Sequence, residues 1–215
     1  MLNKQMEERL FSFIRLEMNQ DLAHDIDHVL RVVKTAKSLC YKERAIEEVV
    51  IPAAYLHDCF SFEKNHPERS QSSVIAAEKA VSFLKSISYP SMYIDDIAHA
   101  IEAHSYSAKI EARTLEAKIV QDADRLDALG AIGVSRCLQV SSKLNRPLYS
   151  SEDSFCSNRM PDDERFTIDH FYKKLLKLED SMNTLSAREE AKRRTAFMRM
   201  YLTQLENEVS ETFLN

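Results

Sequence analysis

A histidine directly before an aspartate, His57-Asp58, ends an apolar run and is the first candidate for chemistry in this chain. Adjacent residues on a helix project about 100° apart, so the two cannot share one buried stripe or one solvated face. Both side chains can still lean towards one point beside a helix end. A neutral imidazole and a carboxylate are good ligands for a divalent metal ion. The pair indicates a metal site if further ligands come from elsewhere.

An earlier stretch, HDIDHVLRV, offers such ligands. His24 and His28 are four residues apart, and Asp25 and His28 are three apart, so on a helix they share a face. Arg31 continues that face one turn later. The stretch therefore combines an imidazole that could bind a metal with a cation that could contact a phosphate or pair with a carboxylate.

A later stretch, QDADRLDALGAIG, carries three aspartates among small apolar residues. Asp124 and Asp127 are three residues apart and share a face, whereas Asp122 lies about 200° from Asp124 on a helix. Asp122 and Asp124 therefore cannot face the same site. Carboxylates in apolar surroundings need a partner, and a metal ion or a hydrogen-bonded histidine would supply one.

Composition limits the class of protein. The 215 residues fit a single domain, and the apolar fraction of 44% permits a sizeable core. A net charge of −5 without a basic tail argues against a dedicated nucleic-acid binder. No apolar run approaches 18 residues and the amphipathic start lacks a signal-peptide pattern, so we expect no membrane span. The widely spaced cysteines indicate reduced thiols and a cytoplasmic protein.

The chain contains only two glycines, Gly130 and Gly133. Neither a P-loop nor a Rossmann fingerprint can be built from them, and Asn-Gly hairpins are absent. Glycine in a helical pattern is unfavourable by about 1 kcal/mol relative to alanine. We therefore expect that another helix closely approaches the helix that carries the aspartates.

Apolar residues recur at helical spacing through nearly the whole chain, which predicts an all-α fold. Residues 143–164 are polar and form a predicted loop or insertion before C-terminal helices within 165–215. The predicted helices cover residues 2–18, 22–42, 44–59, 67–87, 91–104, 113–128, 129–142, 166–179 and 186–212.

Four ordered motifs, HDIDHVLRV, LHDC, KNHPERS and QDADRLDALGAIG, resemble those of small bacterial HD-domain metal-dependent phosphohydrolases. The resemblance covers about residues 20–140 and implies a helical HD core within a single domain of residues 1–215, with additional N- and C-terminal helices. It implies one divalent metal ion held by His28, His57, Asp58 and Asp124. Two imidazoles and two carboxylates suit Mn²⁺, Ni²⁺, Co²⁺, Fe²⁺, Zn²⁺ or Mg²⁺ and do not select among them.

The resemblance also implies a reaction. We expect hydrolysis of a phosphoester or phosphoanhydride of a small molecule, with a nucleotide preferred, by metal-activated water. Asp58 is a candidate proton acceptor, while Lys64 and Arg69, which flank a predicted helix start, would balance phosphate charge. The expected catalytic residues are Asp58, Lys64 and Arg69; the expected substrate contacts are Arg31, Lys64, Arg69, His104 and Asp127.

Two alternatives stay open at this point. One is a non-catalytic HD module that binds a metal and a nucleotide without turnover. The other is a di-iron oxygenase of the HD type, which needs more histidine ligands than the spacing supplies.

His104, in an Ala-His-Ser stretch, could line the pocket, and Asp127 could orient a ligand or form a plain salt bridge. A homodimer through the outer helices is compatible with the pattern.

Overall fold

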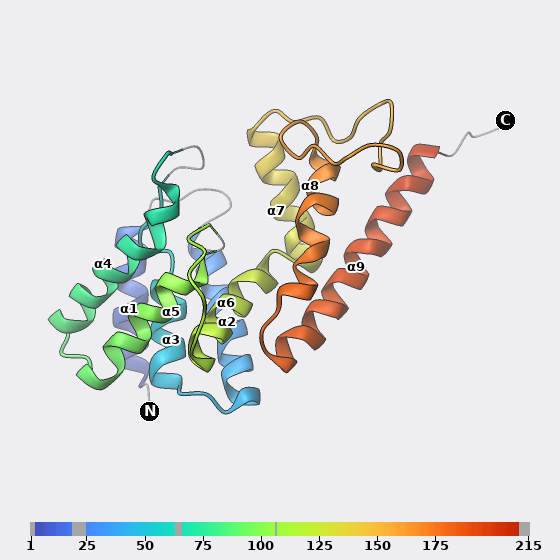
Figure 1. The fold of residues 1–215 in the computed structure, drawn as a ribbon. Coiled ribbons are helices and arrows are strands. Elements are labelled where there is room, and N and C mark those ends of the chain that lie inside the picture. The colour runs from blue at the N-terminus through green and yellow to red at the C-terminus, as the bar shows by residue number, and fades with distance from the viewer. Residues whose placement is uncertain (1–2, 19–24, 63–65, 106, 211–215) are drawn as a thin grey trace. The chain divides into compact units, whose positions relative to one another are not determined.

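The computed structural model describes residues 3–18, 25–62, 66–105 and 107–210, and every regular element in these ranges is a helix (Figure 1). The predicted all-α fold is confirmed. The α-helices are α1 Lys4–Glu17, α2 Ile26–Glu43, α3 Glu47–Leu56, α4 Ser72–Ser86, α5 Ile94–His104, α6 Leu115–Asp127, α7 Gly130–Lys143, α8 Thr167–Lys173 and α9 Leu185–Ser210. Short 3-10 helices are η1 Arg69–Gln71, η2 Ser91–Tyr93, η3 Leu175–Lys177 and η4 Glu179–Ser181.

The chain divides into two compact units. The first unit comprises Met1–Arg125 with Asn183–Ala187, and the second comprises Leu126–Met182 with Arg188–Asn215. The expectation of one domain over residues 1–215 stays a prediction. No helix in the described ranges is long and apolar enough to cross a membrane.

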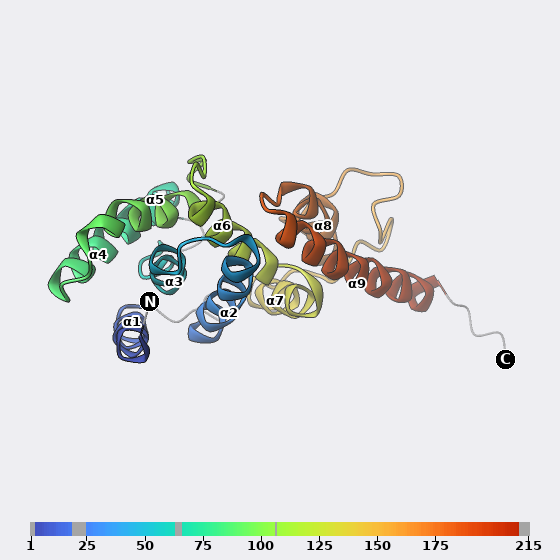
Figure 2. The same ribbon diagram turned by 90° about the horizontal axis from the view of Figure 1, so that it is seen from below.

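Helix α3 is the central element of the first unit (Figure 2). It packs against α1, α2, α4 and α5, and every residue from Val49 to Leu56 is buried. A helix that is apolar on all sides has to lie inside the protein. The His57-Asp58 pair follows directly on Leu56, so this buried helix delivers the pair to the interior.

Pro52 lies inside α3 and has no N–H for the carbonyl four residues earlier. That carbonyl, of Glu48, instead accepts a hydrogen bond of 2.6 Å from the Tyr89 hydroxyl. A side chain thus replaces the missing backbone donor, and the central helix tolerates its proline.

Helix α2 starts and ends with regular caps. The Asp25 carboxylate accepts the His28 backbone N–H at 2.7 Å, which is an N-cap bond. Arg44 ends the helix in the left-handed conformation with φ of 57°. The cap at Asp25 fixes where the helix begins and therefore the direction in which His28 points.

The second unit contains α7, α8 and most of α9, with the Phe171 and Tyr201 rings stacked at 6.3 Å. Residues 144–166 contain no α-helix and link α7 to α8. The two ends of this segment are joined, because Thr167 and Ile168 donate backbone hydrogen bonds to Pro147 and Leu148.

The glycines serve the turn between α6 and α7. Gly130 begins α7 with φ of +69°, a region that favours glycine. A Cβ on Gly133 would lie 2.2 Å from the carbonyl oxygen of Ala128. The expected close approach of another helix is therefore replaced, at Gly133, by close approach of the preceding turn.

Candidate metal centre

Three helices of the first unit bring the predicted metal ligands together. His28 lies in the first turn of α2, His57 and Asp58 follow the end of α3, and Asp124 lies on α6. Ligand atoms of His28, His57 and Asp58 all lie within 4.8 Å of one another. His28 Nε2 is also 3.4 Å from Asp124 Oδ1, so the fourth predicted ligand adjoins the cluster.

His57 has the geometry of a metal ligand. Its side chain is fully buried, and Nδ1 lies 2.8 Å from the carbonyl oxygen of Ala54. A carbonyl can only accept, so Nδ1 carries the hydrogen and Nε2 keeps its lone pair. Among the described residues, Nε2 is buried without a hydrogen-bond partner, and Asp58 Oδ2 lies 3.5 Å from it.

A buried imidazole nitrogen without a hydrogen-bond partner is unfavourable by about 1–3 kcal/mol. A metal ion beside His57 Nε2 would remove this penalty. Ligand histidines commonly donate the other ring N–H to a backbone carbonyl, as His57 does to Ala54. The residues present therefore fit a divalent metal ion.

Asp58 lies among three imidazoles. Its Oδ2 is 3.7 Å from His28 Nε2 and 3.5 Å from His57 Nε2, while Oδ1 is 3.6 Å from His104 Nε2. His104 Nδ1 lies 2.6 Å from the carbonyl oxygen of Ile101, so this ring too turns Nε2 towards the cluster. His104, predicted as a substrate contact, thus borders the predicted metal ligands.

The electrostatics favour a charged carboxylate on Asp124 beside a neutral imidazole on His57. Burial lowers the pKa of His57 and keeps its ring neutral. Burial alone would raise the pKa of Asp124, but the imidazoles of His28, His57 and His104 outweigh it and lower the pKa. Burial likewise opposes protonation of His104, yet the carboxylate of Asp58 raises its pKa overall.

Two predicted phosphate contacts, Arg31 and Arg69, lie on α2 and at the start of η1. Arg31 is half-buried on α2, one turn after His28. Arg69 begins η1 and donates through Nη1 to the carbonyl oxygen of Phe62 at 2.8 Å, so part of its guanidinium holds the loop after Asp58. His24 and Lys64 lie outside the described residues.

Two further aspartates of the QDADRLD stretch have protein partners. Asp127 is buried in the second unit and forms an ion pair of 2.7 Å with Arg136 of α7. Asp122 is fully buried in the first unit and accepts hydrogen bonds from the backbone and side chains of Asn183 and Thr184. Asp122 and Asp124 thus face different neighbours, as expected for residues about 200° apart on a helix.

Sequence reasoning missed the partners of Gln121 and Asp122 on α6, because Asn183 and Thr184 are some 60 residues away along the chain. The sequence did contain a local signal for such partners. Gln121 and Asp122 are polar residues in a stretch that is otherwise largely apolar, and buried polar groups require partners. That signal indicates a network without naming its distant members.

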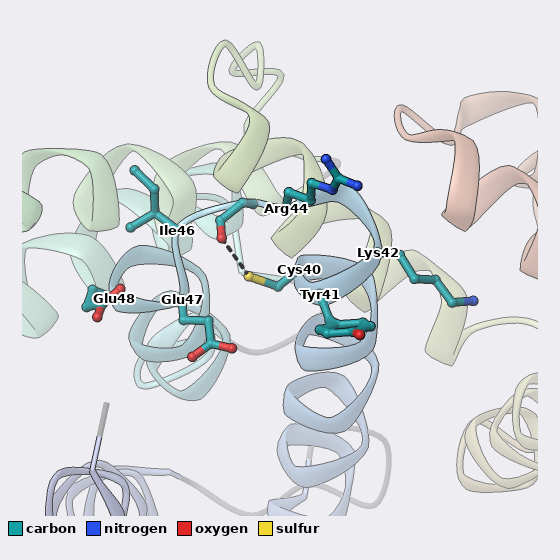
Figure 3. Close-up of a pocket in the computed structure, with 8 residues that line it drawn as sticks. Cys40, Tyr41, Lys42, Arg44, Ile46, Glu47 and Glu48 are labelled. Atoms are coloured by element: carbon teal, nitrogen blue, oxygen red, sulfur yellow. Dashed lines mark hydrogen bonds between the residues drawn. The ribbon is translucent and has the colours of Figure 1, made fainter. Parts of the chain in front are cut away.

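A cavity of about 720 Å³ lies at the turn between α2 and α3 and is separate from the cluster (Figure 3). Its lining residues run from Cys40 to Glu48, at the far end of α2 from His28. A rise of 1.5 Å per residue puts roughly 18 Å of helix between His28 and Cys40. Cys40 is buried with its pKa raised to about 11, so the cavity presents no reactive thiol.

Known proteins similar to this chain were found by sequence and by structure. The HD domain family matches residues 25–129. YpgQ of Bacillus subtilis is 32% identical over 195 residues, which is 89% of this chain and 87% of that protein.

Solved structures agree with the sequence match. The crystal structure of Bacillus subtilis YpgQ in complex with ADP has a TM-score of 0.75 at 30% identity and covers 94% of this chain and 97% of that one. An HD-superfamily hydrolase from Bacillus thuringiensis has a TM-score of 0.75 at 31% identity, covering 98% and 100%. This chain belongs to the HD domain family.

Proposed function

We propose that this chain is a metal-dependent phosphohydrolase that cleaves a phosphoester or phosphoanhydride bond of a small molecule, preferably a nucleotide. The convergence of His28, His57 and Asp58 within 4.8 Å carries the proposal, together with the buried His57 Nε2, which has no hydrogen-bond partner among the described residues. Membership of a family that includes hydrolases supports it.

In this proposal, one divalent metal ion is held by His28, His57, Asp58 and Asp124. When bound, such an ion activates water at neutral pH and withdraws charge from phosphoryl oxygens. The backbone carbonyl of Ala54 holds the His57 ring in the tautomer that offers Nε2. Buried histidines and carboxylates arranged before binding need little reorganisation during the reaction.

The chain's own residues would then handle protons and phosphate charge. Asp58 is the proposed proton acceptor, since Oδ2 faces the two ligand histidines and Oδ1 faces His104. The bond from Arg69 to Phe62 uses one of five guanidinium N–H groups, and we propose that others contact phosphate. Arg31, Lys64 and His104 complete the proposed substrate contacts, whereas the ion pair of Asp127 with Arg136 favours a structural role for that carboxylate.

A nucleotide is the proposed substrate class. Bacillus subtilis YpgQ, 30% identical to this chain in the solved complex, was crystallised with ADP. That complex concerns the relative. It supports testing nucleotides first, and whether phosphate or pyrophosphate leaves is part of the test.

The test is a hydrolysis screen. Metal-free protein would be combined in turn with Mn²⁺, Ni²⁺, Co²⁺, Fe²⁺, Zn²⁺ and Mg²⁺ and with nucleoside mono-, di- and triphosphates. Phosphate and pyrophosphate would be measured separately. We expect turnover that needs the metal ion. Nucleotide binding without turnover under every metal would instead identify a non-catalytic binding module.

Single substitutions test the ligand assignment. His57→Ala or Asp58→Ala should remove the bound metal and reduce turnover by at least about 10³-fold, because the ion contributes several kcal/mol to the transition state. Helical circular dichroism should stay unchanged. His99→Ala is the matched control, because His99 lies on α5 outside the cluster and accepts the Arg113 backbone N–H. Metal retained in both ligand variants would refute the assignment.

A further inference from the structure

Gln121 is a buried glutamine on α6, three residues before Asp124, with 6% of its surface exposed. Its Nε2 donates to the carbonyl oxygen of Ala103 at 2.6 Å, and its Oε1 accepts from Asn183 Nδ2 at 2.9 Å. A donor faces an acceptor at each end of the amide, so one orientation satisfies both bonds. This side chain is held on two sides and ties α6 to α5.

The bond to Ala103 acts at the end of α5. The last four carbonyls of a helix have no donor within the helix and need partners from elsewhere. The carbonyl of Ile101 contacts the His104 ring, that of Glu102 accepts from the Ser73 hydroxyl, and that of Ala103 accepts from Gln121. His104 therefore stands on a helix end that side chains of α4 and α6 hold in place.

Asn183 keeps the Gln121 amide from rotating. Its Nδ2 group also donates to Asp122 Oδ1 at 2.8 Å, and its backbone N–H donates to the same oxygen at 2.9 Å. Thr184 occupies the other oxygen of Asp122 through its backbone N–H and hydroxyl. These residues all belong to the first unit, so the network lies within one compact body.

We infer that Gln121 is a positioning residue that fixes His104 of α5 relative to Asp124 of α6, and thereby fixes the arrangement of the metal ligands. His104 Nε2 lies 3.6 Å from Asp58, and Asp124 lies 3.4 Å from His28 Nε2, so both side chains border the cluster. Gln121 itself acts only through Ala103 and its own helix. This inference rests on the metal site of the proposed function.

The experiment measures Co²⁺ binding to the metal-free protein by its visible absorption. Gln121→Met keeps the volume of the side chain and removes both hydrogen bonds. We expect the Co²⁺ dissociation constant to rise about tenfold, as for partners that orient metal ligands, and the absorption bands to change. Tyr89→Phe is the matched control, since Tyr89 is also 6% exposed and also donates a 2.6 Å bond to a helix carbonyl.

Tyr89→Phe should lose a comparable amount of stability and keep the wild-type Co²⁺ affinity and spectrum. If Gln121→Met behaves as Tyr89→Phe does, the inference is overturned. Should Gln121→Met fail to fold, the half-buried Asn183→Ala tests the same point, because it releases the Gln121 amide oxygen. An unchanged Co²⁺ dissociation constant in that variant would also overturn the inference.

The two proposals fail differently in this experiment. Wild-type protein that binds no Co²⁺ refutes the metal site, and with it both proposals. Wild-type protein that binds Co²⁺ but hydrolyses no nucleotide refutes only the proposed reaction. A weakened Co²⁺ site in Gln121→Met still supports the positioning by Gln121 in that case.

Discussion

Asp122 and Asp124, two positions apart on α6, have opposite surroundings. Asp122 is fully buried and accepts four hydrogen bonds from Asn183 and Thr184. Asp124 keeps 30% of its side chain exposed and faces the histidines of the cluster. Asp122 is thus hydrogen-bonded within the protein, whereas Asp124 is a proposed ligand of the metal ion. The two should therefore respond differently to loss of their charge.

Asp122→Asn should lower the free energy of unfolding by about 3 kcal/mol. The amide N–H group of asparagine would face hydrogen-bond donors, whereas the buried carboxylate accepts hydrogen bonds from them. Asp124→Asn should change the stability of the metal-free protein by less than about 1 kcal/mol. At saturating metal concentration, folded Asp122→Asn should still bind one metal ion per chain. Asp124→Asn should bind less than one metal ion per chain. Denaturant unfolding and metal analysis check both; equal stability losses would contradict the prediction.

The turn between α6 and α7 leaves little space for a side chain at Gly130 or Gly133. Gly133 has no room for a Cβ, since the contacted atoms of Ala128 belong to the backbone. Gly130 has a positive φ, and a Cβ there would meet the Arg194 side chain at 3.2 Å. Arg194 donates through Nη1 to the carbonyl oxygen of Leu126, so it closes the same turn.

Gly133→Ala should destabilise the protein by roughly 2–4 kcal/mol, because either the Ala128 backbone or α7 must move. Gly130→Ala should have a smaller effect of about 1 kcal/mol, the strain of alanine at positive φ. Both values follow from the midpoints of denaturant unfolding, compared at a common dependence of the free energy of unfolding on denaturant concentration. The reverse order would show that Gly133 has more room than the structure gives it.

A buried carboxylate is one of the groups that hold the segment 144–166. Asp169 of α8 is fully buried, pairs with Arg159 through both oxygens and accepts the Asp162 backbone N–H at 2.6 Å. Burial alone would raise the pKa of Asp169, but the hydrogen bonds from Arg159 and Asp162 outweigh it and lower the pKa. The long loop is therefore anchored to a helix by charge.

A carboxyl group with a lowered pKa in the folded state stabilises the protein above its unfolded pKa, about 3.9 for aspartate. That stabilisation is lost as the pH falls through the folded pKa. Asp169→Asn should cost about 3 kcal/mol at pH 7, by leaving Arg159 without its charge partner. The difference from wild type should shrink below about pH 4. Unfolding measured from pH 7 to pH 3 checks this; a constant difference would contradict it.

At the scale of the whole molecule, the proposed ligands all come from the first unit. His28, His57, Asp58 and Asp124 lie within Met1–Arg125. A ligand that binds only folded protein stabilises it by RT ln(1 + [L]/Kd). The benefit of a metal ion should therefore appear first in the unit that holds its ligands.

Saturating metal, at one hundred times its Kd, should stabilise the protein by about 2.7 kcal/mol, and chelation should reverse this. Hydrogen exchange should show the strongest protection on α2, α3 and α6, where the ligands lie. Asp58→Ala should show neither effect. Protection confined to the second unit would place the ion elsewhere.

The sequence by itself determined the helical class, the approximate helix ranges and the candidate ligands. Apolar spacing at 3.6 residues is local, and a buried helix such as α3 reads as a continuous apolar run. The angular argument on α6 also separated Asp122 from Asp124 because it needs only the helix period. The family resemblance selected His28 and Asp124 from several alternatives.

Only the tertiary structure decided which distant groups meet. Asp58 lies among three imidazoles, from α2, from the residue after α3 and from α5, and Gln121 reaches Ala103 and Asn183. Helices packed in three dimensions join such residues although they are far apart in the chain. The need for glycine at position 133 was also visible only in the structure. A Cβ there would clash with the backbone of Ala128, and no residue pattern specifies where that backbone lies. Periodicity fixes which face a residue occupies, whereas packing decides what that face meets.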